Sequence, residues 1–333
     1  MASLARTVTT VLLAAVLAGG VTACGGGGTG GGGDHAATPG GPFPVSVPGR
    51  FGTTTVPERP VRVVAMDSAD ADFALSLGVV PVGIGRGNNA PTDIQPWTAP
   101  ALGGRTPAAF DARQGDPLEA IAALRPDLIL ATKDFNLDQS HEMLSRIAPV
   151  VSYQRGPNDD PWQQSLDSVA RALGVAEQGR RVVADTQAWI GQQKAARPEL
   201  TGRTFTYLVA PGASGIVAVN SPDDVSVRVL VELGMRMSPS VLPLPTAGVP
   251  GRAPVSEENM RLVDADVILA AGSPAGLAGL ARNPVFQGLR AVRGNAYLTV
   301  DYTLASALVY PTPLSLRWAL PQLLPQLSAA VTP

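Results

Sequence analysis

Cysteine and histidine are almost absent from this sequence of 333 residues. Cys24 is the only cysteine, so no disulfide bond can form within the chain. The two histidines, His35 and His141, have no cysteine partner at zinc-ligand spacing, so we expect no protein-bound metal. No glycine-rich dinucleotide motif, Walker A motif or serine-hydrolase motif is present. The sequence therefore predicts a protein that is not an enzyme and has no cofactor of its own.

Charge is also scarce. Charged residues make up 16% of the chain, and the formal net charge of −2 gives no electrostatic basis for nucleic-acid binding. Lysine occurs only at positions 133 and 194, so arginine supplies most of the cations. The apolar content of 45% fits a globular protein, and the length suffices for two domains.

Residues 1–23 have the pattern of an export signal peptide. Arg6 precedes an apolar run at residues 11–18, which is too short to span a bilayer. The following Val21-Thr22-Ala23-Cys24 resembles the bacterial lipobox. That resemblance implies that Cys24 is lipidated and anchors the protein at the outer face of the cytoplasmic membrane; the alternative is a plain secretory signal. The Gly- and Pro-rich segment 24–58 predicts a flexible tether.

The stretch from Asp116 to Leu130 predicts a short helix, a tight turn and a buried strand. Asp116 is expected to cap the helix, and Glu119 stands at the capping-box spacing. Arg125-Pro126 should end the helix, because a residue before proline is pushed out of the α region. The apolar run 128–130 is typical of a strand that is covered on both faces.

The same unit returns 139 positions later. Glu119 then corresponds to Glu258, and Asp127 corresponds to Asp266. The strand 128–130 corresponds to 267–269, and Ser256 is the expected cap. A helix–Asp–strand unit used twice predicts two similar α/β lobes.

The remaining segments predict strands that alternate with helices, and hence mostly parallel sheets. Further strands are expected at 62–66, 81–85, 150–151, 204–209 and 296–300, and further helices at 70–77, 140–148, 161–173 and 221–233. Residues 88–111 are predicted to form a loop, and a closing helix at 314–327 to be interrupted by Pro321 and Pro325. The helix expected at 176–196 is the natural connector between the lobes.

The order of these segments resembles the iron–siderophore and cobalamin class (class III) of ABC-importer substrate-binding proteins. The resemblance rests on Leu77-Gly78, Pro81-Val82-Gly83, Leu118–Ile121 with Pro126–Ile129, Asp264–Ile268, Asn283–Phe286 and Val292–Tyr297. It implies an α/β fold of two Rossmann-like lobes joined by one long helix, with the ligand in the cleft between them. The implied divisions are an N-terminal lobe at 59–157, connecting helices at 158–200 and a C-terminal lobe at 201–333.

The resemblance implies a ferric siderophore as ligand, with the iron bound through the chelator. Ligands of parallel sheets lie beyond the carboxyl ends of the strands, and a chelate of this size needs apolar surfaces and arginine donors. The expected ligand-binding residues are Arg86, Trp97, Lys133, Tyr153, Arg155, Arg236 and Tyr302. Many relatives carry an arginine where this chain has Ala210-Pro211-Gly212, a departure that disfavours a strongly anionic catecholate.

The resemblance also implies a monomer that docks on an ABC permease dimer through one acidic residue per lobe. The matching positions are Glu119 and Glu258, although each glutamate also suits the positive end of its own helix. The function expected from the sequence is therefore delivery of a ferric siderophore to an ABC importer. The alternative is an envelope protein of the same fold that does not transport and binds haem or cell-wall partners.

Overall fold

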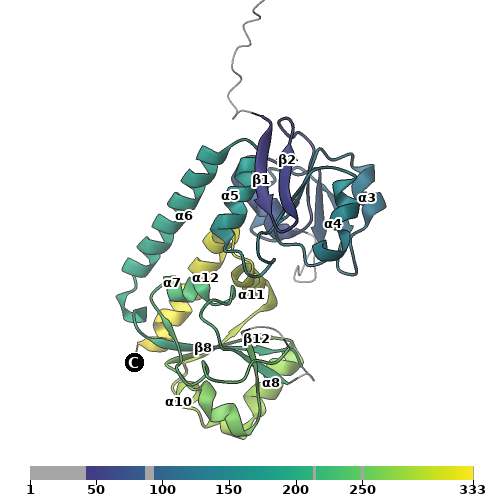
Figure 1. Ribbon diagram of the computed structural model, residues 1–333. Helices are drawn as coiled ribbons and strands as arrows, with labels where there is room; N and C mark the ends of the chain where they lie inside the picture. Colours follow the sequence, from purple (N-terminus) through teal and green to yellow (C-terminus); the bar gives the residue numbers. More distant parts are fainter. Residues whose placement is uncertain (1–42, 87–93, 213–214, 249–250, 333) are drawn as a thin grey trace, which may run out of the picture. The chain divides into compact units, whose positions relative to one another are not determined.

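Two separate β-sheets form the framework of the folded chain (Figure 1). The structure is a computed structural model, and it describes residues 43–86, 94–212, 215–248 and 251–332. The first sheet is wholly parallel and has the strand order β5-β4-β3-β6-β7. Its strands are β3 (Val63–Ala65), β4 (Gly83–Arg86), β5 (Ala108–Asp111), β6 (Leu128–Ala131) and β7 (Val150–Ser152).

The second sheet is mixed and has the order β11-β9-β8-β12-β13, with β10 paired to β8. Strands β8, β10, β12 and β13 are parallel to one another, whereas β9 runs antiparallel to both of its neighbours. The strands are β8 (Thr204–Ala210), β9 (Ile216–Val219), β10 (Arg236–Met237), β11 (Arg252–Val255), β12 (Val267–Gly272) and β13 (Tyr297–Val300). The two sheets confirm the predicted α/β fold of two lobes.

The first lobe carries helices α1 to α5. They are α1 (Ser68–Ser76), α2 (Thr98–Ala101), α3 (Leu118–Ala123), α4 (Leu137–Ser145) and α5 (Trp162–Ala172). Asp67 caps α1 by accepting a hydrogen bond of 2.9 Å from the backbone N–H of Ala69. Gly78, at φ 80°, ends the helix as the sequence predicts, because glycine adopts this conformation without a steric penalty.

The second lobe carries the remaining short helices and the closing helix. They are α7 (Arg228–Glu232), the 3-10 helix η2 (Glu258–Val263), α8 (Pro274–Arg282), α9 (Pro284–Gln287), α10 (Arg290–Arg293), α11 (Tyr302–Val309) and α12 (Pro313–Val331). Residues 221–227, predicted as helix, form turns instead. Asp224 holds them by accepting a hydrogen bond of 2.9 Å from the N–H of Ser226, a local bond that competes with a helix.

Helix α6 (Ala176–Ala195), followed by η1 (Pro198–Leu200), connects the lobes (Figure 1). It packs closely on α5, because a Cβ on Gly179 would lie 2.4 Å from the Cβ of Ala170. Helix α5 in turn contacts α1 of the first lobe. Near its other end α6 contacts α12, where the guanidinium of Arg317 lies 5.1 Å from the ring centroid of Trp189.

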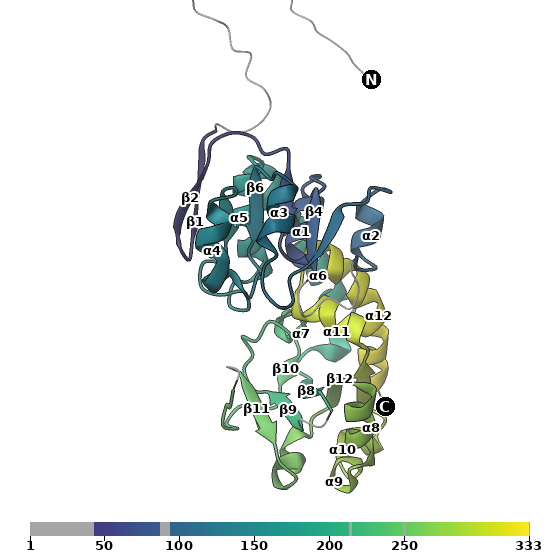
Figure 2. The same cartoon turned by 90° about the vertical axis from the view of Figure 1, so that its right-hand side faces the viewer.

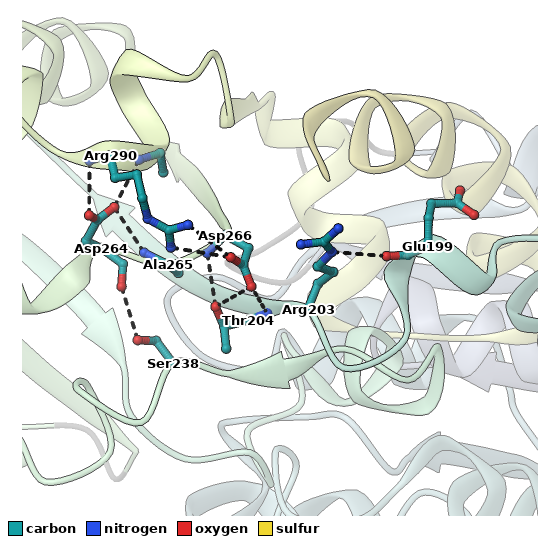
Figure 3. A network of polar contacts seen from close by, with 9 residues as sticks. Glu199, Arg203, Thr204, Ser238, Asp264, Ala265, Asp266 and Arg290 are labelled. Carbon is teal, nitrogen blue, oxygen red and sulfur yellow. Dashed lines mark hydrogen bonds and ion pairs between the residues drawn. The ribbon is translucent and has the colours of Figure 1, made fainter. Parts of the chain in front are cut away.

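The repeated aspartate has the same structural task in both lobes. Asp127 accepts hydrogen bonds from the backbone N–H groups of Val61 and Arg62, just before β3. Asp266 accepts one of 2.8 Å from the N–H of Thr204, the first residue of β8, and it also bonds Arg290 (Figure 3). Each aspartate therefore joins its own strand to the neighbouring central strand at the amino ends.

The prediction that Asp116 caps α3 is wrong. No side chain caps this helix, and Asp116 instead accepts hydrogen bonds from Ser140 and Asn136 at the start of α4. The turn after α3 confirms its predicted end, with Arg125 at φ 47°. In the second copy, Ser256 accepts a bond of 3.3 Å from the N–H of Asn259, in agreement with its expected role.

The predicted tether extends too far into the sequence. Residues 45–56 form an antiparallel hairpin of β1 (Val45–Gly49) and β2 (Gly52–Val56). The hairpin is joined to β7 by a hydrogen bond of 2.6 Å from the Thr54 hydroxyl to the Val150 carbonyl. Val47 and Val56 are buried in the core, which gives this segment the apolar anchor that a tether lacks.

Two further expectations need correction. The predicted loop 88–111 contains α2 and β5, and the buried Phe110 fixes β5 to the sheet. Helix α12 is continuous through Pro321 and Pro325. Both prolines lie on its exposed face, where water can bond the carbonyls that lose their partners.

One apolar core runs through both lobes. It includes Phe73 of α1, Trp162 of α5, Leu269 of β12 and Leu320 of α12. Helix α12 contacts both α1 and β12, and so links the first lobe to the second sheet (Figure 2). Within the described ranges, no helix has the length and apolarity that a transmembrane crossing requires.

Candidate functional site

Aromatic side chains of the two lobes meet beyond the ends of β6 and α11. Phe135 follows β6, and its ring stands edge-on to that of Tyr310 at a centroid distance of 6.1 Å. Phe135 is 44% exposed. Tyr302, the first residue of α11, is 51% exposed and lies within electrostatic reach of Tyr310. We call Phe135, Tyr302 and Tyr310 the interlobe aromatic cluster. It presents apolar ring surface to solvent from both lobes, as a site for a flat or bulky ligand requires.

A small cavity lies next to Tyr310 of this cluster. Its volume is about 20 Å³, which holds about one water molecule. Both lobes line it, with Lys133 and Asp160 from the first and Arg228, Glu232 and Tyr310 from the second. The cavity therefore belongs to the junction of the lobes, and a chelate must lie outside it.

Lys133 is 4% exposed and helps to close this junction. Its Nζ donates hydrogen bonds to the carbonyls of Pro157, at 3.0 Å, and Asp160, at 2.9 Å. Burial lowers the pKa of the ammonium to about 8, against the opposing effect of the Asp70 carboxyl. Lys133 thus lies at the predicted place, but its donors already hold the loop that leads into α5.

Asp72 of α1 accepts hydrogen bonds from its own lobe and from the start of α12. It accepts hydrogen bonds from Trp97 Nε1 at 2.7 Å, Thr98 Oγ1 at 2.6 Å and Thr312 Oγ1 at 2.9 Å. Burial raises its pKa to about 7, in spite of these three donors. Trp97, expected to bind ligand, is 8% exposed and packs 5.2 Å from Trp318 between ring centroids.

Other carboxyls crowd the same end of the first sheet. Asp70 accepts bonds from the N–H and the hydroxyl of Thr132, and burial raises its pKa to about 7. Burial also raises the pKa of Asp67 to about 6. Burial, followed by the neighbouring Asp116 carboxylate, raises the pKa of Asp134 to about 8. This end of the lobe therefore holds several acidic groups with weakened tendency to ionise.

The predicted arginines of the first lobe lie at the carboxyl ends of its strands, beside acidic partners. Arg155 forms an ion pair of 3.3 Å with Asp160, and its side chain is 61% exposed. Arg86 ends β4 opposite Asp111, and its charge helps to lower the pKa of that carboxyl. Arg113, which the sequence interpretation did not select, binds Asp111 directly.

Two predicted ligand residues are not brought to the interlobe aromatic cluster. Tyr153 is 3% exposed, and its hydroxyl donates a hydrogen bond of 2.9 Å to Asp138. Arg236 lies in β10, which pairs with the first residues of β8, so it stands at the amino ends of the strands. The prediction placed it on a loop at the opposite edge, because the short β10 was not recognised.

Glu119 and Glu258 are both exposed, one in each lobe. Glu119 lies in the first turn of α3, which follows β5, and Glu258 begins η2, which follows β11. Because β11 runs in the same direction as β8, both glutamates stand near the carboxyl ends of their sheets. This placement is compatible with contact to a two-fold partner.

Sequence reasoning missed Phe135, Tyr310 and Asp72. Phe135 follows the predicted strand 128–130, so the available signal was an aromatic residue beyond the carboxyl end of a strand. Nothing in the sequence pairs Asp72 with Thr312, because 240 residues separate them.

Cys24 and His35 lie outside the described residues. Within the described ranges, no group of three His, Cys, Asp or Glu side chains is arranged to hold a metal ion.

The chain was compared with models of known protein families. The family model described as "Periplasmic binding protein" matches residues 63–301. The chain belongs to the periplasmic binding protein family. Members of this family bind solutes rather than convert them, so the prediction that the chain is not an enzyme is confirmed.

Solved structures of periplasmic binding proteins support the two-lobe class III fold. A periplasmic solute binding protein from Mycobacterium smegmatis is 26% identical, with a TM-score of 0.74 over 86% of this chain and 99% of that chain. The iron-uptake protein PiaA from Streptococcus pneumoniae TIGR4, in complex with ferrichrome, is also 26% identical, with a TM-score of 0.74 over 86% of this chain and 98% of that chain.

Among curated proteins, a Fe(3+)-citrate-binding protein, YfmC from Bacillus subtilis, is 29% identical over 48% of this chain and 49% of its own length. The chain spans about half the length of the curated relatives that it matches. The resemblance to the siderophore-related members of the family is thereby confirmed.

Proposed function

We propose that this periplasmic binding protein captures a ferric siderophore between its lobes and delivers it to an ABC importer. The observation that carries the proposal is the interlobe aromatic cluster, in which exposed rings from both lobes flank one region. Ferric chelates shield their iron with their own oxygen ligands, so the protein needs to recognise an organic surface rather than the metal. The similarity to a protein crystallised with ferrichrome and to one named for ferric citrate supports a ferric chelate as ligand.

The proposed location is the outer face of the cytoplasmic membrane. The support is the lipobox-like sequence that ends at Cys24, followed by a glycine-rich segment. A tether of about 20 Gly-rich residues gives a root-mean-square reach of roughly 25 Å, so the lobes remain close to a membrane-embedded permease. Glu119 and Glu258 are the proposed contacts with that permease, one per lobe.

Titration of the purified protein with ferric chelates tests this function. Tryptophan fluorescence or calorimetry should show binding of at least one ferric siderophore and no comparable binding of the iron-free chelator. Phe135→Ala and Tyr302→Ala should each weaken binding by about tenfold, since each removes exposed aromatic contact area. Phe51→Ala is the matched control, because Phe51 is 38% exposed on the β1–β2 turn and stacks on His141.

Haem and cobalamin belong in the same titration. Binding of haem alone would replace the proposed function by the envelope-protein alternative. Failure of every ferric chelate to bind would also contradict it.

A further inference from the structure

Basic side chains at the carboxyl ends of the strands, where ligands of parallel sheets lie, already have acidic partners. On the first lobe, Arg113 binds Asp111, Arg86 lies within electrostatic reach of the same carboxylate, and Arg155 binds Asp160. The positive charge of these arginines is therefore largely balanced by carboxylates before any ligand binds.

The second lobe repeats this arrangement next to Tyr310. Arg252 forms an ion pair of 3.1 Å with Asp224, and both charges act on the Tyr310 hydroxyl. Both partners of the pair are poorly exposed, with side-chain exposures of 18% and 9%. Arg228, which lines the small cavity, has Glu232 within electrostatic reach.

The internal segments that the structure does not describe, 87–93, 213–214 and 249–250, contain neither lysine nor arginine. Lys133 is bound to two backbone carbonyls. An anionic ligand that displaced water here would meet cations that already have partners, so no new ion pair would compensate for the cost of removing water from its charge.

We infer that the interlobe site selects a ferric chelate without net negative charge, of which the neutral or cationic ferric trihydroxamates are the common chemical class. This inference rests on the proposed function. The exposed rings of Phe135 and Tyr302 supply the attraction, through apolar contact and, for a cationic chelate, through cation–π contact. Citrate and catecholate complexes of iron carry several negative charges and fit this site poorly.

The test begins with two chelates that share one iron centre and differ chiefly in the charge of their free end. Ferrioxamine B carries one free ammonium group, and its N-succinyl derivative replaces that charge by a carboxylate while the iron centre is unchanged. The full-length protein should bind ferrioxamine B at least about tenfold more tightly than the succinyl derivative. Ferric dicitrate and a ferric tris-catecholate should bind more weakly than ferrioxamine B.

A second arm alters the protein. Asp224→Asn keeps the hydrogen-bond acceptor for Ser226 but leaves Arg252 without its counter-charge. The ratio of the affinity for ferrioxamine B to the affinity for the succinyl derivative should therefore fall by about threefold or more. Asp167→Asn is the matched control, because Asp167 pairs with Arg171 on the exposed surface of α5 and should change nothing.

The two proposals fail in different ways. Equal or tighter binding of the succinyl derivative, or tightest binding of the citrate or catecholate complex, overturns the charge inference and leaves siderophore binding intact. Absence of binding by all four ferric chelates overturns both.

Discussion

The hydroxyl of Thr312 donates a hydrogen bond of 2.9 Å to Asp72, 240 residues earlier in the chain. Thr312 also caps α12 by accepting a bond of 3.0 Å from the N–H of Ser315. The start of the closing helix is thus bound directly to α1 of the first lobe. Because both side chains are fully buried, this contact joins the lobes without help from solvent.

Loss of the Asp72 carboxylate should destabilise the whole fold. Asp72→Ala leaves three buried donors without an acceptor, so the free energy of unfolding should fall by about 3 kcal/mol or more. Thr312→Val removes only the interlobe bond and should cost about 1 kcal/mol. Urea denaturation measures both. Asp167→Ala, in an exposed ion pair, should cost less than about 0.5 kcal/mol and serves as the control.

The buried carboxyls should make the protein more stable in mild acid than at neutral pH. Burial raises the pKa of Asp72 from 3.8 to about 7, so between these values the folded protein holds a proton that the unfolded chain has released. Stability should therefore fall as the pH rises from about 4 to about 7, and Asp70 acts in the same direction.

Urea denaturation at pH 5, 6 and 7 measures this slope. Asp72→Asn cannot titrate and should show a shallower pH dependence than the unaltered protein. The range ends below the pKa of Lys133, about 8, so that its titration does not contribute. A stability that increases between pH 5 and 7 would contradict the prediction.

Ligand binding should change the relative position of the lobes very little. The lobes are joined by α6, by the Asp72–Thr312 bond and by a continuous apolar core, and bending would have to break all three. Small-angle scattering of residues 40–333 with and without ferric chelate should show a change in radius of gyration below about 1 Å. A change of several ångströms would indicate a hinged protein.

Charge reversal at the two exposed glutamates should separate transport from binding. The double variant Glu119→Lys, Glu258→Lys should abolish uptake of radioactive ferric chelate in cells that lack other copies, because the permease contact loses its charge complementarity. Its affinity for the chelate in solution should stay unchanged. Glu142→Lys with Glu177→Lys, at exposed positions on α4 and α6, controls for a general effect of added charge.

Cys24→Ala should release the protein from membranes without altering its fold. The acyl chains supplied at Cys24 are the expected anchor, and the described residues contain no helix suited to cross a bilayer. Cell fractionation and a thermal melting curve measure the two outcomes. Persistence of the variant in the membrane fraction would refute the lipid anchor.

The sequence was sufficient for features that depend on local pattern. The apolar run of β6 and the glycine after α1 each act within a few residues, and the predicted strand and the predicted helix end are both present. The hairpin at 45–56 was missed because its glycines and proline resemble those of the tether, although Val45 and Val47 alternate as in a strand.

The site was less predictable because it depends on contacts between distant segments. Trp97 was expected at a ligand surface, yet Asp72 and Trp318 draw it into the interior. Arg236 was misplaced because β10 is only two residues long. The pairing of Arg252 with Asp224, 28 residues earlier in the chain, follows from the folded arrangement and not from spacing along the sequence.

The apolar core that runs from α1 through α5 to α12 also bears on how the protein unfolds. Two lobes with separate cores can melt one at a time, whereas a shared core couples their melting into one cooperative transition. A destabilising change in α12 would then reduce the fraction of molecules with an intact binding region, even though α12 lies behind it. In cells such a change would appear as lower abundance of the protein at constant affinity, and, under the proposed function, as slower uptake of its ligand.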